Sequence, residues 1–126
     1  MSLRSPLGRA RGLGSAKEGV EHWWHQRLTA LALIPLSLWF VASVAFMAGM
    51  DHATFIAWVG NPLVAVLLVL LIVALFYHLK LGVQVVIEDY VHHPAAKLFC
   101  ELCNTFGNII LATACLFAVL KIAFAG

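Results

Sequence analysis

Three long stretches of the sequence carry no charged side chain, and this feature constrains the fold more than any other. They cover residues 28–50, 53–77 and 102–120, and the second holds an unbroken apolar run from Leu63 to Tyr77. A helix that crosses a bilayer needs about 20 mostly apolar residues, because the hydrocarbon core is about 30 Å thick and each residue adds about 1.5 Å. Each stretch is therefore long enough to hold a membrane-spanning helix.

The composition supports this interpretation. Of the 126 residues, 63% are hydrophobic and 11% are charged, whereas a soluble domain has roughly 25% charged residues. Three buried helices of a soluble protein would need far more polar surface, and the alternation of membrane barrel strands is absent. The sequence predicts an all-α membrane protein with three transmembrane helices in a bundle, at about 28–50, 62–88 and 98–122.

Local signals indicate how these spans are connected. Gly60-Asn61-Pro62 is typical of a turn, since proline suits the first turn of a following helix. Residues 53–59 are then expected to form a short interfacial helix. Pro94 breaks the chain before the third span, and Pro35 favours a kink in the first, where neighbouring groups can satisfy the freed carbonyl.

The positive charges predict an orientation. Of the eight Lys and Arg residues, five precede the first span, two flank the second connection and one lies near the C-terminus. The positive-inside rule then places the N-terminus on the cytoplasmic side, or in the matrix of an organelle. The net charge of +2 is too small to indicate a nucleic-acid partner.

The N-terminal region divides into two segments. Residues 1–20 are rich in Gly, Ser and Arg and are expected to form a flexible basic tail on anionic lipid; a transit segment is the alternative. Residues 21–27 are expected to form a short interfacial segment, with Trp23 and Trp24 in the aromatic belt. The predicted organisation is a tail at 1–20 and a three-helix anchor at 21–126.

His78 is the most informative polar residue of the predicted spans. It precedes Tyr90 by twelve residues, which corresponds to about 18 Å of helix and places it near mid-membrane. A polar group at that depth is costly and needs a partner. Three roles are open: an interhelical hydrogen bond, an axial ligand of a haem, or a proton relay.

The neighbours of His78 favour the haem. Gly82 follows by one helical turn, so it shares a face with His78 and leaves a flat slot that suits a porphyrin. A low-spin haem needs a second axial ligand, and the other histidines are expected on the outer side or near the inner interface: His52; His22, His25, His92, His93. That ligand must come from another copy or another subunit.

Asp89 and Tyr90 lie on the same side of this helix, at its inner end. A phenol can donate a hydrogen bond to a quinone carbonyl, and a neighbouring carboxylate can deliver protons. The alternative is an ordinary pair of residues at a helix end. Arg27 opens the first span, where it can anchor to lipid phosphates or point inward at an anionic group.

Other polar residues in the spans have simpler interpretations or none. Asn104 and Asn108 lie one turn apart and are expected to make helix–helix contacts. Cys100 and Cys103 form a C-x-x-C pair that lacks further ligands and is interpreted as packing. For Lys80, a side chain that snorkels toward the cytoplasm, a pair with Glu101 and a contact with a haem propionate all stay open.

The motifs resemble those of the smaller, hydrophobic membrane-anchor subunit of succinate dehydrogenase, respiratory complex II. The resemblance covers about residues 15–125 and rests on R-L-T-A at 27–30, H-x-x-x-G at 78–82 and D-Y at 89–90. It implies that His78 is an axial ligand of a b-type haem, with the second ligand from a larger cytochrome b anchor subunit. It also implies that Tyr90 contacts ubiquinone, with Asp89 close by and Arg27 near both groups.

The resemblance further implies an assembly with an iron–sulfur subunit and a flavoprotein subunit, which oxidise succinate and pass electrons to ubiquinone. The chain has no dinucleotide fingerprint and too few cysteines for clusters. The bacterial inner membrane is the expected location, with the mitochondrial inner membrane as the alternative. A small homo-oligomeric transporter and a haem-free structural anchor are the competing functions.

Overall fold

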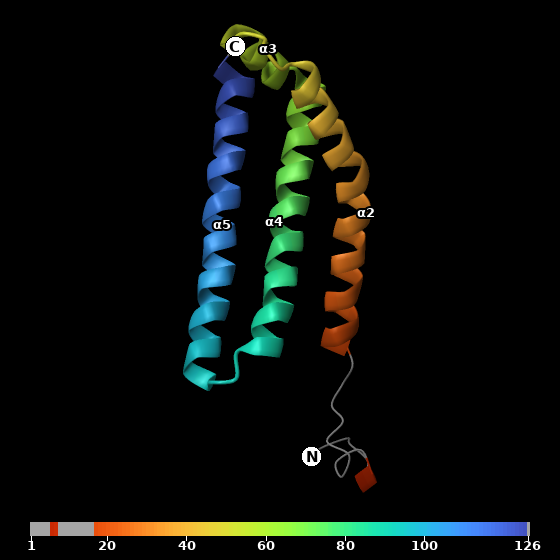
Figure 1. Ribbon diagram of the computed structural model, residues 1–126, viewed down its shortest axis with the longest axis vertical. Coiled ribbons are helices and arrows are strands. Elements are labelled where there is room, and N and C mark those ends of the chain that lie inside the picture. The colour runs from red at the N-terminus through yellow and green to blue at the C-terminus, as the bar shows by residue number, and fades with distance from the viewer. Residues whose placement is uncertain (1–5, 8–16, 126) are drawn as a thin grey trace.

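The computed structural model describes residues 6–7 and 17–125, so most of the predicted basic tail lies outside the described residues. Three long helices run side by side, and a short helix crosses one end of them (Figure 1). They are listed in chain order: α2 Lys17–Phe46, α3 His52–Gly60, α4 Pro62–Tyr90, α5 Pro94–Ala125. All three long helices are long and apolar enough to cross a membrane, which confirms the predicted spans.

Within the predicted bundle, the long helices form an open row. α4 packs against both α2 and α5, whereas α2 and α5 make no close backbone contact in the described part of the chain. Five of the buried hydrophobic side chains lie on α4: Ala65, Leu68, Leu71, Leu81, Ile87. Outward-facing apolar surface costs nothing in lipid, so no hydrophobic force closes the row.

The first helix differs from its predicted bounds at both ends. It begins at Lys17, so residues 21–27 are continuous with the span and do not form a separate interfacial segment. The helix continues through Pro35 and ends at Phe46, four residues before the predicted end. Gly49 follows with a φ of 86°, a left-handed conformation that glycine adopts without strain and that commonly terminates helices.

The connection between α2 and α4 is fixed by two caps. The Asp51 carboxylate accepts hydrogen bonds from the Thr54 hydroxyl at 2.6 Å and from its backbone N–H at 3.0 Å. These bonds favour the charged form and hold the pKa of Asp51 below its usual value. Asn61 caps α4 in the same way, with Pro62 at its first position. The predicted short helix and turn are thereby confirmed.

α5 is joined to α4 by a polar contact within the membrane region. The buried Asn104 side chain donates from Nδ2 to the Lys80 carbonyl at 3.0 Å. Asn108 instead donates to the carbonyl and Oδ1 of Asn104, both at 2.8 Å. The expected helix–helix contact is confirmed for Asn104, whereas Asn108 supports it from within α5.

Replacement of Asn104 by alanine should weaken the packing of α5 on α4. Interhelical hydrogen bonds of this kind contribute about 0.6 kcal/mol on average and at most about 2 kcal/mol. We expect a lower midpoint of thermal denaturation for the purified protein in mild detergent. Asn108→Ala is the matched control and should lower the midpoint less, because its donor stays within α5. Equal losses would contradict a specific interhelical role for Asn104.

Candidate functional site

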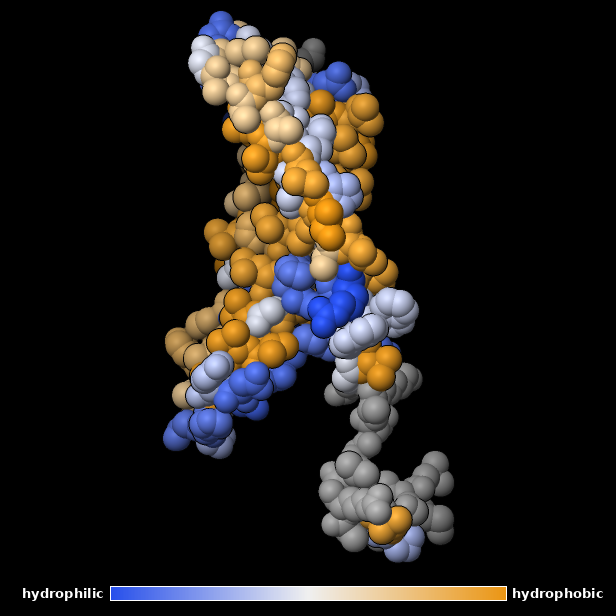
Figure 2. All heavy atoms as spheres, turned by 45° about the vertical axis from the view of Figure 1, so that its right-hand side comes forward, coloured by the Kyte–Doolittle hydropathy of each residue, from blue (hydrophilic) through white to orange (hydrophobic). Residues whose placement is uncertain are grey.

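The hydrophilic side chains gather in the lower half of the molecule, around the first turns of α2 and the second half of α4 (Figure 2). His78 is half-buried there and faces α2. Its Nδ1 lies 3.0 Å from Oγ1 of Thr29. His78 therefore makes the interhelical hydrogen bond that is one of the roles open to it, and it does so with one ring nitrogen.

The Thr29 hydroxyl is also tied to its own helix. Oγ1 lies 2.8 Å from the carbonyl oxygen of His25 and 3.0 Å from that of Gln26. Threonine commonly bonds the carbonyl one turn back in membrane helices, because no water competes for it. The Thr29 side chain is thus held in one rotamer, with Oγ1 facing His78.

A second contact joins the same turns of α2 and α4. The Tyr77 hydroxyl lies 2.7 Å from Nδ1 of His25, and the two rings are 5.7 Å apart. Tyr77 directly precedes His78, and His25 supplies the carbonyl that receives the Thr29 hydroxyl. The two interhelical contacts are made by adjacent residues of α4, Tyr77 and His78, and together they hold this turn of α4 against α2.

Gly82 lies against α2. A Cβ at this position would stand 3.7 Å from Nε2 of Gln26, which is ordinary van der Waals contact, so a larger side chain would meet the amide. Two buried polar atoms in this region have no hydrogen-bond partner: Oε1 of Gln26 and Nε2 of His22. The Gln26 amide of α2 thus borders the space beside Gly82.

Asp89 and Tyr90 are the last residues of α4. The helix ends there because Val91 is extended and Pro94 starts the next helix. Both side chains are exposed, Tyr90 to 78%. The phenol and the carboxylate are therefore available to a molecule at this end of the row, which Figure 1 shows to be the end where α2 begins.

Arg27 does not point between the helices. Its guanidinium lies 5.5 Å from the ring centroid of Trp23, in a cation–π contact, and its side chain is exposed. Such a contact contributes about 0.5–1 kcal/mol at an exposed site. The arrangement suits a residue at the membrane surface beside an aromatic belt, so the inward alternative has no support from the geometry.

The donor atoms fit a haem shared with another chain. Nδ1 of His78 is engaged by Thr29, so Nε2 is the nitrogen left for iron. Unsatisfied polar atoms of His22 and Gln26 lie on the same helix pairing. Among the described residues no group of three or more His, Cys, Asp or Glu side chains could enclose a metal ion.

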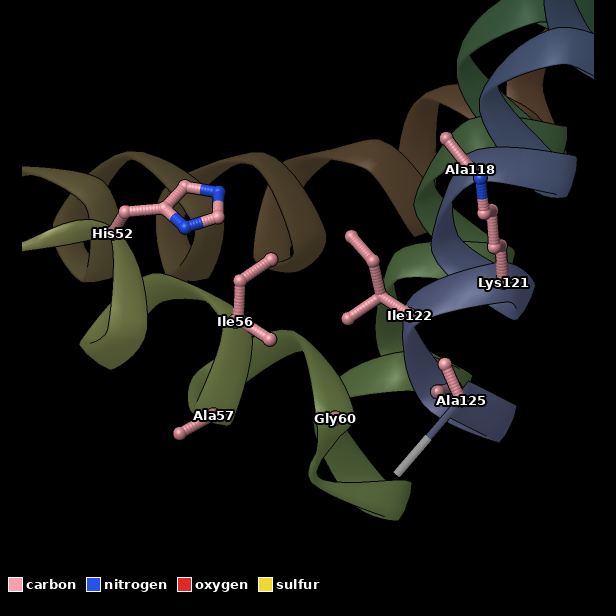
Figure 3. Close-up of a pocket in the computed structure, with 9 residues that line it drawn as sticks. His52, Ile56, Ala57, Gly60, Ala118, Lys121, Ile122 and Ala125 are labelled. Carbon is pink, nitrogen blue, oxygen red and sulfur yellow. The ribbon is translucent and has the colours of Figure 1, made fainter.

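Two hollows of the described residues lie toward the opposite end. One of about 860 Å³ is bordered by α3 and the end of α5, with His52 and Lys121 at its rim (Figure 3). Another, of about 620 Å³, is lined by apolar side chains of all four helices. Neither includes His78, so the candidate site rests on the polar contacts between α2 and α4.

Sequence reasoning missed three residues of this site: Thr29, His25 and Tyr77. Thr29 stands within the R-L-T-A motif, but its partner is 49 positions away. Tyr77 ends an apolar run and reads as one more lipid-facing side chain. For Thr29 the sequence did hold one signal, the helical spacing of polar residues. His22, Gln26 and Thr29 share one face of α2.

The fold and the site together define a multi-pass membrane protein with polar groups clustered between its first two spans. A family model described as "Succinate dehydrogenase/Fumarate reductase transmembrane subunit" matches residues 1–121. The chain belongs to this family, and it is a membrane-anchor subunit of the succinate dehydrogenase complex. Family membership sets aside the transporter interpretation.

Individual relatives agree. The chain is 33% identical over 120 residues to the "Succinate dehydrogenase hydrophobic membrane anchor subunit" of Rickettsia bellii (strain RML369-C), covering 95% of this chain and 88% of the relative. It is 31% identical over 114 residues to the protein of the same description from Paracoccus denitrificans, covering 90% and 88%. No solved structure matches the chain.

Proposed function

We propose that this anchor subunit contributes His78 as one axial ligand of a b-type haem and Asp89 and Tyr90 to a ubiquinone-reduction site. The observation that carries the haem assignment is the contact of Nδ1 with Thr29, which leaves Nε2 of a half-buried, mid-helix histidine for iron. A bound haem would supply a one-electron carrier within the membrane.

The second axial ligand comes from the larger cytochrome b anchor subunit. His78 lies about 18 Å of helix from Tyr90, and the other histidines of the described residues stand on other elements or nearer the helix ends. A partner that packs on the open row would also cover apolar side chains that α2 and α4 leave exposed.

The quinone site uses the exposed end of α4. The Tyr90 hydroxyl donates a hydrogen bond to a carbonyl oxygen of ubiquinone, and Asp89 holds or delivers the proton that reduction requires. Gly82 lacks a side chain beside the haem position and lets Gln26 of α2 approach α4 there, and Arg27 lies at the membrane surface in the haem and quinone region. Succinate oxidation itself belongs to the flavoprotein and iron–sulfur subunits.

We place the N-terminus and the α4–α5 connection at the cytoplasmic face of a bacterial inner membrane. The support is the charge distribution, with five of the eight positive residues before α2 or in its N-terminal part and Lys97 in the first turn of α5. This orientation puts Asp89 and Tyr90 on the side where the soluble subunits dock.

Purification of the intact complex in mild detergent tests the proposal. We expect the flavoprotein, iron–sulfur and larger anchor subunits to co-purify, and reduction to give a b-type absorbance. A fully assembled complex that reduces ubiquinone but has no b-type absorbance would overturn the haem assignment and leave a haem-free structural anchor. A complex that oxidises succinate with a dye but cannot reduce ubiquinone would overturn the quinone assignment.

A further inference from the structure

We infer that Thr29 is the positioning residue that fixes the tautomer and the ring orientation of His78 and thereby tunes the haem. This inference rests on the proposed haem function and goes beyond it, because it assigns the ligand's properties to a side chain of another helix. It is carried by three distances around one oxygen atom.

The hydrogen-bond donors and acceptors can be assigned from these contacts. A threonine hydroxyl has one proton, and carbonyl oxygens can only accept. Oγ1 lies 2.8 and 3.0 Å from two carbonyl oxygens, so its proton is directed at them. Toward His78, Oγ1 therefore accepts, and Nδ1 of His78 carries the proton. The remaining nitrogen, Nε2, then has the lone pair that iron requires.

The geometry of Thr29 makes this assignment rigid. Threonine is β-branched and populates few rotamers in a helix, and its bond to the preceding turn selects one of them. The Tyr77–His25 contact holds that same turn of α2 against α4. Oγ1 is thereby kept at a constant distance from the imidazole, and the ring cannot rotate without leaving its Nδ1 proton unpaired in lipid.

The chemical consequence is a more basic ligand. A hydrogen bond from the second ring nitrogen of a ligating histidine raises the basicity of the metal-bound nitrogen. Greater basicity favours the ferric state and lowers the reduction potential of the haem. A neutral hydroxyl acceptor raises the basicity of the ligand less than a carboxylate acceptor does. With Thr29, the haem potential is therefore expected to lie between that of a histidine without an acceptor and that of a histidine paired with a carboxylate.

The test compares Thr29→Val and Thr29→Ser in the purified four-subunit complex. Valine keeps the shape and removes the acceptor; we expect haem affinity to fall about 10-fold or more, as for other losses of such partners. The haem that remains should show a raised midpoint potential and an altered low-spin electron paramagnetic resonance signal. Serine keeps the acceptor and should retain the wild-type signal. Thr113→Val, on the exposed side of α5, is the matched control and should change none of these.

The outcomes separate this inference from the proposed function. If wild type holds haem and His78→Ala loses it, but Thr29→Val keeps the wild-type potential and signal, the role of Thr29 is overturned while that of His78 stands. If the wild-type complex lacks haem, the proposed haem function is wrong, and the inference about Thr29 is wrong with it. If Thr29→Val does not assemble, Thr29→Cys replaces it, because a thiol matches serine in size but accepts weakly. Equal potentials in the Cys and Ser variants would overturn the inference.

Discussion

Replacement of His78 by alanine is expected to remove nearly all of the reduced b-type absorbance from the purified complex. The loss should exceed that of Thr29→Val, because an axial ligand disappears and not only the group that orients it. His78 faces the α2–α4 contact with Nδ1 already engaged, and it is the one histidine of α4, so no other imidazole of this helix can replace its Nε2. Pyridine haemochrome spectra per complex, normalised to bound flavin, measure the effect.

His52→Ala is the matched control for this experiment. His52 is exposed and opens α3 at the other end of the row, so its loss should leave the spectrum intact. Succinate oxidation with an artificial dye reports whether the soluble subunits remain bound to each variant. An assembled His78→Ala complex with an unchanged spectrum would remove His78 as the ligand.

Hydropathy alone predicted the spans because lipid imposes a simple requirement. Every residue of a span can face either lipid or a neighbour, so long uncharged runs identify α2, α4 and α5 without knowledge of their packing. The start of α2 was harder to predict. Residues 21–27 are mostly polar, yet they belong to α2, which begins at Lys17. His22 and Gln26 are half-buried, and Gln26 lies against Gly82 of α4.

The open row could not be predicted from the same pattern. In water, an exposed apolar face would drive three helices into a closed bundle, because burial of that face is favourable. In lipid that drive is absent, and specific contacts decide which helices meet. Here they are Asn104 to the Lys80 carbonyl, Thr29 to His78 and Tyr77 to His25, and all three involve α4.

The two parts of the site differ in how readily the sequence reveals them. His78 and Gly82 stand out in the sequence because each is unusual in an apolar span and their spacing shares one helix face. Thr29 is an ordinary residue of such a span, and only its distance to Nδ1 gives it a role. The residues proposed to supply chemistry were thus identifiable from the sequence, whereas the contact proposed to orient one of them required the structure.

Tyr90→Phe should slow ubiquinone reduction while succinate oxidation with an artificial dye stays at the wild-type rate. The substitution removes one hydroxyl and keeps the ring, so it deletes a hydrogen bond to the quinone and little else. A bond worth about 1.4 kcal/mol in the transition state corresponds to a tenfold rate effect. We therefore expect kcat/KM for ubiquinone to fall about tenfold, with haem content unchanged.

Asp89→Asn distinguishes binding from proton delivery. Asparagine keeps the size of the side chain and one acceptor oxygen, but it replaces the other oxygen by an NH2 donor and cannot hold a transferable proton. We expect kcat to fall with little change in KM. Tyr90→Phe, in contrast, should also raise KM, because the lost bond is present in the bound ground state. Parallel loss of dye-linked and quinone-linked rates in either variant would show that the residue serves the fold of the α4 end and not the quinone.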